Sequence, residues 1–307
     1  MDAIDIAIIR ELLINSRMTY KQLSNRIELT VPTIHKRVQS LIDKGIITSF
    51  KANLGIEYLN AIQVHFLTTG KIKNLEKIIE EFNADENTAT LHIGSNDHIH
   101  VGGLLKNISE LDQYENYIKS KIGVNFQHVG LMNHSEYHTN WISRKEGNWK
   151  RIPLSNIDKK IIRFLHTDAR KTISDIASEI GYSVKTVRKE LDKLIDHHVL
   201  EFSINWNPSS SGNIVPFIHI YLSDGVEKEK IYPLLKNRYT RLIFNFMFHN
   251  ISNLIVSTAW VENLQQLEEL KNNLESEEGI EYVKPIIIYS GHHFPTWRDQ
   301  KLQEMMK

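Results

Sequence analysis

Residues 30–43 read TVPTIHKRVQSLID, and residues 183–196 read SVKTVRKELDKLID. In both stretches a Thr or Ser precedes apolar residues that recur every three or four positions, which predicts a capped amphipathic helix. The likeness extends outward in unbroken register, so that Ile4-Asp5 aligns with Ile157-Asp158 and more than forty residues match in spacing. The chain is therefore a tandem duplication.

Each copy is predicted to contain three short helices followed by extended chain. In the first copy, apolar spacing over residues 4–12 predicts the first helix, and Thr19 with Gln22 resembles a capping box before the second. The third helix starts after Thr30 and ends at Gly45. Residues 46–52, and residues 199–206 in the second copy, read as extended. Three helices and a β-wing describe a winged helix-turn-helix.

After each winged unit the apolar period changes from helical to alternating. The predicted order is strand 61–68, helix 71–82, strands 88–94 and 98–104, helix 109–122 and strand 125–131. The second half repeats it with strand 214–222, helix 228–236, strands 242–248 and 254–260, helix 261–276 and strand 280–289. The order β-α-β-β-α-β is ferredoxin-like. The fold class is therefore α+β, with winged helix-turn-helix domains at 1–53 and 154–206, ferredoxin-like domains at 54–139 and 207–307, and a linker at 140–153.

Composition narrows the function classes. The 307 residues include 37 Lys+Arg, 37 Asp+Glu and no Cys. The chain therefore has no disulfides, thiolate metal sites or cysteine nucleophile. No apolar run approaches the ~20 residues that span a bilayer, and Asp2, Asp5 and Glu11 are atypical of a signal peptide. We expect a cytoplasmic protein without membrane association.

Three motifs resemble the Lrp/AsnC (feast/famine) family of transcription regulators. Asp5 to Leu12 has the form Asp-x-x-Ile-Ile-Arg-x-Leu, similar to the family's first helix. Gly94 to Asp97 has the family's Gly-x-x-Asp form, and Gly291 to Trp297 is similar to C-terminal tails of archaeal members. The resemblance implies two such regulators fused head to tail, binding double-stranded DNA. His249 to Ser252 departs from Gly-x-x-Asp, which places a ligand role at that turn in doubt.

The third helix of each winged unit is the expected DNA reader. Arg and Gln suit bidentate contacts with base edges, and Lys suits phosphates. The candidate DNA-binding residues are Lys21, Thr33, His35, Lys36, Arg37, Gln39, Ser40 and Lys51 in the first unit, and Lys185, Thr186, Arg188, Lys189 and Lys193 in the second. The alternative is a solvated helix face. Residues 1–53 carry eight basic and five acidic side chains, so we expect the first copy to bind DNA better.

The duplication also predicts an intramolecular pseudo-dimer. We expect the two ferredoxin-like sheets to pack face to face, and the two recognition helices to meet half-sites about one turn, ~34 Å, apart. Because His35-Lys36-Arg37 and Arg188-Lys189-Glu190 differ, each half should read a different sequence. The family resemblance leaves further homo-oligomerisation open.

The resemblance also implies a small-molecule effector, such as an amino acid, near the turn between the second and third strands of a ferredoxin-like domain. Asp97 would orient a ligand amino group, and Gly94 would permit close approach of the backbone. The alternative is a plain hairpin turn, because Gly, Ser, Asn and Asp are turn-forming residues.

Fifteen histidines suggest metal or haem binding, although scattered packing histidines are the default interpretation. His92, His98 and His100 are the first candidates, since they share one face of neighbouring strands. No HExxH motif or Cys partner supports a metal site, and we expect neither metal nor cofactor. Aromatic tails at Tyr137 to Trp141 and Phe294 to Trp297 are interpreted as packing clamps that cover the sheet or bridge the halves.

An enzyme is the competing function. Sirohaem decarboxylases share this two-domain layout, occur as paired or fused halves, and use His and Arg near a tetrapyrrole. No matching catalytic stretch is recognised here, and P-loop, dinucleotide and nucleophile-elbow motifs are absent from the sequence. The sequence therefore favours a regulator that is not an enzyme, with a tetrapyrrole decarboxylase as the alternative.

Overall fold

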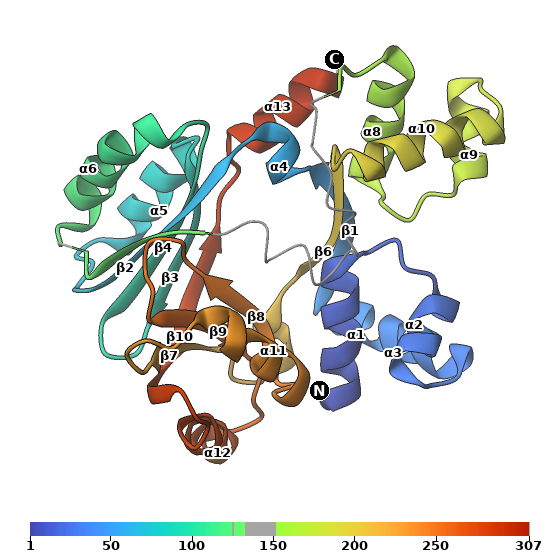
Figure 1. Ribbon diagram of the computed structural model, residues 1–307. Helices are drawn as coiled ribbons and strands as arrows, with labels where there is room; N and C mark the ends of the chain where they lie inside the picture. Colours follow the sequence, from blue (N-terminus) through green and yellow to red (C-terminus); the bar gives the residue numbers. More distant parts are fainter. Residues whose placement is uncertain (125, 133–151, 307) are drawn as a thin grey trace. The chain divides into compact units, whose positions relative to one another are not determined.

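A computed structural model describes residues 1–124, 126–132 and 152–306. The chain divides into two compact units (Figure 1). The first lies within residues 1–60, 141–212 and 298–307, and the second within 61–140 and 213–297. The winged elements of both copies share the first unit, and the ferredoxin-like elements of both share the second. The predicted linker at 140–153 and the tail at Tyr137 to Trp141 lie almost entirely outside the described residues.

The first unit contains two three-helix sets that follow the predicted pattern. Their bounds are α1 Ala3–Ile14, α2 Tyr20–Ile27 and α3 Val31–Asp43, then α8 Asn156–Thr167, α9 Ile173–Ile180 and α10 Val184–Asp196. The predicted capping box at Thr19 and Gln22 is present, and Thr30 accepts the backbone N–H of Thr33. Gly45 ends the first recognition helix at φ +68°, a conformation that costs other residues more. A short α4, Ile56–Leu59, was not predicted.

The predicted wings are strands that pair with each other. β1, Ile47–Leu54, runs antiparallel to β6, Leu200–Trp206, and together they form a two-stranded sheet. The extended segments were predicted correctly, and their pairing with each other is a feature that was not predicted. A lone extended segment would leave its backbone groups without hydrogen-bond partners. Here each strand forms backbone hydrogen bonds along one edge with the strand of the other copy.

Two equivalent arginines also join the winged units, because each donates hydrogen bonds to backbone carbonyls of the other copy. Arg17 donates to the carbonyl oxygens of Ala169 and Lys171, and Arg170, its repeat equivalent, donates to Ser16 O at 3.0 Å. The Arg170 guanidinium also lies 4.0 Å from the centroid of the Phe50 ring. Reciprocal contacts between equivalent residues show that the first unit is an intramolecular pseudo-dimer.

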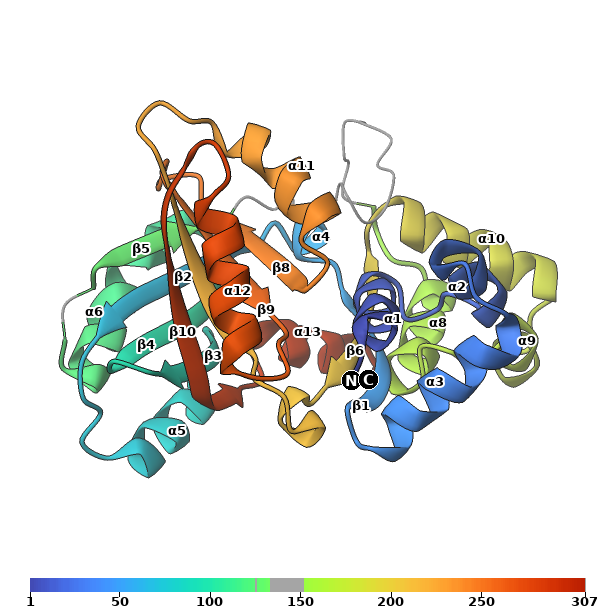
Figure 2. The ribbon, with the colours of Figure 1, turned by 90° about the horizontal axis from the view of Figure 1, so that it is seen from below.

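The second unit is built on an eight-stranded sheet of order β5-β2-β4-β3-β10-β7-β9-β8. The first half supplies β2 Ile62–Thr69, α5 Leu75–Ala84, β3 Thr88–Gly94, β4 His98–Leu105, α6 Leu111–Ile122 and β5 His128–Leu131. The second supplies β7 Pro216–Leu222, α11 Lys228–Arg238, β8 Leu242–Met247, β9 Leu254–Ala259, α12 Leu264–Glu275 and β10 Ile280–His293. Figures 1 and 2 show α5 and α6 against the first half and α11 and α12 against the second. The β-α-β-β-α-β order is confirmed in both halves.

The two halves are joined by β10, which is longer than predicted. Its residues 280–287 pair with β7, and its residues 288–293 pair with β3 of the other half. Met132 bridges Phe248 at the opposite edges of the sheet. The expectation of two separate sheets was therefore wrong, although side chains on their inner faces do meet. The Phe294 to Trp297 tail bridges the halves as predicted, since the Trp297 indole donates to Leu104 O at 2.7 Å. A final helix, α13 Trp297–Met306, was not predicted.

Candidate nucleic-acid interface

The recognition helix of the first copy, α3, separates a buried face from an exposed one. Ile34, Val38 and Leu41 are at most 1% exposed and form the packing face. On the other side, His35, Lys36 and Gln39 are exposed, and Thr33 and Ser40 are half-buried. The helix therefore presents most of the predicted readers to solvent.

Arg37 is placed differently from its neighbour Lys36. Its Nη1 lies 2.8 Å from carboxylate oxygens of both Asp2 and Asp5, on α1 and its N-cap. The hydrogen bonds to these two carboxylates raise the pKa of Arg37. Among described residues, Lys36 forms no ion pair. Arg37 therefore fastens α3 to α1, and Lys36 is the α3 cation left to meet a phosphate.

Other α3 candidates also make local contacts. The Oγ1 atoms of Thr33 and Thr30 lie 2.8 Å apart, and Gln39 donates to Asp43 at 2.8 Å. The His35 ring stands edge-on to Tyr20 with centroids 5.0 Å apart. The first two contacts lie within α3 and its N-cap. The His35–Tyr20 contact orients the first turn of α3 relative to α2, the element that precedes a recognition helix in the DNA-binding arrangement.

The recognition helix of the second copy, α10, carries more unpaired charge. Lys185, Arg188 and Lys189 are exposed, and none forms an ion pair with a described residue. They line a surface groove of about 510 Å³ that also borders Lys193 and His197. α10 thus has three cations without an ion pair to a described residue against one on α3, although the exposed Asp192 and Asp196 line the same groove. That the first copy binds DNA better stays a prediction.

Lys193 is a structural cation like Arg37. Its Nζ lies 2.8 Å from Asp158, whose side chain is fully buried, and 2.5 Å from Glu190. Burial alone would lower the pKa of Lys193, but hydrogen bonds to these two carboxylates raise it. Thr186, in the first turn, pairs with the Ser183 hydroxyl at 2.8 Å. Lys193 thus compensates a buried carboxylate at the start of α8.

The two remaining candidate cations, Lys21 and Lys51, differ in their exposure to solvent. Lys21 on α2 is exposed, as a phosphate contact requires. Lys51 is half-buried in the β1–β6 pair, opposite Ser203, and its carbonyl accepts the Ser16 hydroxyl at 3.5 Å. Lys51 lies on the first wing, as predicted, but the pairing of this wing with β6 was not predicted, because an isolated strand segment gives no sign of its partner.

The Gly94 to Asp97 turn is occupied by contacts with the other half. A Cβ on Gly94 would lie 2.6 Å from Ile286 Cγ2 and 3.0 Å from Ile287 O, so the close backbone approach there is to β10. Ser95 N–H donates to Ile287 O at 2.8 Å. Asn96 and Asp97 both have φ +57°, the conformation of a type I′ hairpin turn. Asp97 itself is exposed at the tip.

The turn at His249 to Ser252, which lacks the Gly-x-x-Asp form, also contacts the opposite half. Asn250 donates to Val129 O at 2.7 Å and accepts Leu131 N–H at 2.8 Å, both on β5. Each turn therefore binds the last strand of the opposite half. The difference between Gly94-x-x-Asp97 and His249-x-x-Ser252 changes the side chains but keeps this connection.

The predicted histidine trio lies on the inner face between the two half-sheets. His98 and His100 are 2% and 3% exposed, and the second half adds His219, also 3% exposed. The His100 ring lies 4.9 Å from that of His219, and His92 lies 5.1 Å from Phe217. Burial lowers the pKa of His92 and of His219 to about 3. His219 was missed, although it alternates with apolar residues on a predicted strand.

The described residues contain no cluster of three His or acidic side chains that could hold a metal ion. Nε2 of His98, of His100 and of His219 is buried without a hydrogen-bond partner among them. Burial away from solvent disfavours the charged form of these three imidazoles. They are therefore neutral rings packed against other rings, and they need no acidic partner.

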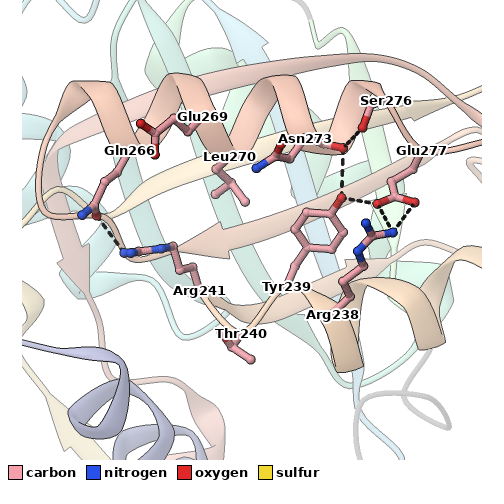
Figure 3. A pocket seen from close by; sticks show the side chains of 10 residues that line it. All are labelled: Arg238, Tyr239, Thr240, Arg241, Gln266, Glu269, Leu270, Asn273, Ser276 and Glu277. Carbon is pink, nitrogen blue, oxygen red and sulfur yellow. Dashed lines mark hydrogen bonds and ion pairs between the residues drawn. The ribbon is translucent and has the colours of Figure 1, made fainter.

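A polar pocket of about 330 Å³ lies between the end of α11 and α12 (Figure 3). Arg238 pairs with Glu277 at 2.8 Å, Tyr239 donates to Asn273 O, and Arg241 donates to Gln266 at 2.7 Å. The polar side chains of the wall are thus engaged with one another, and none of these contacts favours a particular ligand class. Its exposed rim also distinguishes it from a buried ligand site.

No helix in the described part of the chain is long and apolar enough to cross a membrane. The paired winged units, with exposed cationic third helices, define a protein of the winged helix-turn-helix DNA-binding class. Residues 1–48 match the family model for winged helix-turn-helix DNA-binding domains, and residues 154–195 match the AsnC-type helix-turn-helix domain.

Relatives agree with this class. The chain is 32% identical over 91 residues to the HTH-type transcriptional regulator Ptr1 of Methanocaldococcus jannaschii, which covers 26% of this chain and 62% of that protein, less than two thirds of its length. It is 26% identical over 145 residues to the regulator FL11 of Pyrococcus furiosus, covering 47% of this chain and 94% of FL11. The chain is therefore similar to Lrp/AsnC-type transcription regulators, with two winged units in one polypeptide.

A solved structure matches nearly the whole chain. The siroheme decarboxylase NirDL aligns with a TM-score of 0.56 over 99% of this chain and 98% of that chain, at 11% identity. This likeness extends the fold to the fused arrangement of both halves. At so low an identity it concerns the fold alone.

Proposed function

We propose that the protein is a sequence-specific DNA-binding transcription regulator whose helices α3 and α10 read two different half-sites. The observation that carries the proposal is the set of exposed cations on both recognition helices that take part in no ion pair with a described residue: Lys36, Lys185, Arg188 and Lys189. The helix-turn-helix matches and the similarity to transcription regulators support DNA-binding regulation in general. The differing side chains of α3 and α10 support an imperfectly palindromic operator.

The unequal number of unpaired cations on the two helices supports different contributions of α3 and α10 to DNA binding. Three cations on α10 supply most of the phosphate attraction, which sets affinity and register. On α3, His35, Lys36 and Gln39 leave a less charged surface beside the Arg37 ion pairs. Electrostatic affinity is therefore expected to depend more on the second copy than on the first.

The test is the salt dependence of DNA binding by the full chain. A duplex is selected from the protein's own promoter region, and its affinity is measured by fluorescence anisotropy at several salt concentrations. In the variant Lys185→Ala/Arg188→Ala/Lys189→Ala, the slope of log K against log salt should fall by about 0.9 for each phosphate that the protein no longer neutralises. Lys71→Ala/Lys73→Ala/Lys77→Ala removes three exposed lysines of the second unit and serves as control. Equal slopes in wild type and the α10 variant would reject the proposal.

We also propose a small-molecule effector, such as an amino acid, at the Gly94 to Asp97 turn. Asp97 supports it, since its carboxylate is exposed and forms no ion pair with a described residue. Thermal-shift titration with individual amino acids should identify a stabilising ligand. Asp97→Asn removes the charge and keeps a residue that tolerates φ +57°, so it should abolish that shift without lowering the melting temperature of the free protein. An unchanged shift in Asp97→Asn places the ligand elsewhere.

Tetrapyrrole chemistry is the weaker alternative, favoured by the histidines between the half-sheets. Imidazole nitrogen is a common ligand of haem iron, and Nε2 of His100 and of His219 has no hydrogen-bond partner among described residues. These side chains are 3% exposed and in ring contact with one another, so a tetrapyrrole does not fit the arrangement as it stands. If the Soret band of an added iron tetrapyrrole shifts when the protein is present, and this shift is lost in His100→Ala, the enzyme is favoured.

A further inference from the structure

The first residue of each recognition helix is an exposed valine. Val31 of α3 is 40% exposed and Val184 of α10 is 41% exposed. The other apolar residues on the packing faces behave differently, since Val38 and Val187 are fully buried and Leu191 is 2% exposed. The two valines therefore contribute little to the core of either winged unit.

The two valines are equivalent positions of the duplication. The exposed Lys36 and Lys189 are equivalent as well, whereas other exposed residues around the valines have diverged. Pro32 corresponds to Lys185 and His35 to Arg188, whereas Val31 corresponds to Val184. The exposed part of an apolar side chain gives no stabilisation that would favour keeping it in both copies. A shared role outside the folded core accounts for its presence in both.

The first turn of each helix leaves mainly these methyl groups to face a partner. Thr33 pairs with the Thr30 hydroxyl, and Thr186 with the Ser183 hydroxyl, each at 2.8 Å. The hydroxyl groups thus bond within the turn. The N-terminal residues of a recognition helix are those that contact base edges in the major groove.

We infer that Val31 and Val184 each contact the C5-methyl group of a thymine, one in each half-site. In the major groove thymine alone presents a methyl group, and small apolar side chains recognise it. The cations beside the valines, Lys36 on α3 and Lys185 and Arg188 on α10, would hold the phosphates on either side. The inference rests on the proposed DNA-binding function and specifies which base the first turn of each helix reads.

The experiment replaces thymine by uracil, which keeps base pairing and removes only the methyl group. The duplex is obtained by selection from a randomised pool with the full-length protein, and each thymine is replaced in turn. One uracil in each half-site should weaken binding about fourfold, the effect of one buried methyl. In Val31→Ala the penalty should disappear in one half-site and persist in the other. Val184→Ala should give the converse.

Ile108→Ala provides the matched control, because Ile108 is 48% exposed in the second unit and lies on no winged element. It should keep both uracil penalties. If wild type binds the selected duplex with salt-sensitive, sequence-specific affinity but tolerates every uracil, the inference is wrong and the proposed function stands. Penalties that persist unchanged in both valine variants also overturn it. If no selected duplex is bound at all, the proposed function fails first.

Discussion

Acid should weaken the second unit through His219, which lies on β7 between the two half-sheets. Its side chain is 3% exposed, and burial lowers its pKa to about 3 from 6.5. The nearby charges and titratable groups, His98, Lys284 and His128, also lower it. Because the folded-state pKa lies below the unfolded value, the neutral ring contributes fully above pH 6.5. That contribution is lost as the pH falls toward 3.

The size of the effect follows from the two pKa values. Between pH 7.5 and pH 5 the unfolded state binds a proton at this ring and the folded state does not, which costs ~2 kcal/mol of unfolding free energy. The variant His219→Gln has no titrating group at this position. Urea unfolding of both proteins at pH 5 and pH 7.5 should therefore show a fall in stability that is ~2 kcal/mol smaller in the variant.

The comparison of pH slopes remains informative if His219→Gln lowers stability at both pH values. Ile108→Ala, at an exposed position of the same unit that carries no titrating group, is the control and should keep the wild-type slope. Equal slopes for wild type and His219→Gln would mean that the ring is already protonated in the folded protein or reaches solvent. Either result would refute the buried neutral core.

Three further changes test particular contacts. Lys193→Met leaves the buried Asp158 carboxylate without its cation and should cost about 3 kcal/mol in urea unfolding, whereas the exposed Lys189→Ala should leave stability unchanged. Arg37→Ala should lower the melting temperature by releasing Asp2 and Asp5, whereas Lys36→Ala should weaken DNA binding at constant melting temperature; the reverse pattern would exchange their assigned roles. Gly94→Ala should destabilise by about 1–3 kcal/mol, because its Cβ would lie 2.6 Å from Ile286; an unchanged midpoint would show that β10 is not held there.

Local rules predicted most elements from the sequence, because caps and apolar periods are decided by neighbours along the chain. The Thr19 capping box and strand 88–94 occur as predicted. Pairings between distant strands could not be predicted in this way. The second part of β10, with Gly291 and two histidines, lacks an alternating apolar pattern because it crosses to β3 of the other half.

The candidate site shows the same division. Sequence identified the helices α3 and α10 and their exposed faces, since helical spacing separates buried from exposed positions. It could not separate Lys36 from Arg37, because the difference lies in carboxylates 32 and 35 residues away. It also gave Lys193 the same role as Lys189, although Asp158 holds only the former.

Fusion of two halves changes what each half can become. In a dimer of identical chains every contact must be compatible with its own symmetric copy. Here the two junctions between the halves differ, since one joins β3 to β10 inside the sheet and the other brings its edge strands together. Gly94 admits the close approach of β10 at one junction, whereas at the other Phe248 packs where a Cβ on Gly130 would lie 2.4 Å from its ring. Because the two halves are parts of one covalent chain, each half always meets the other and never its own copy. The helices α3 and α10 can therefore diverge in charge. The result is that α10 alone carries the cluster Lys185, Arg188 and Lys189.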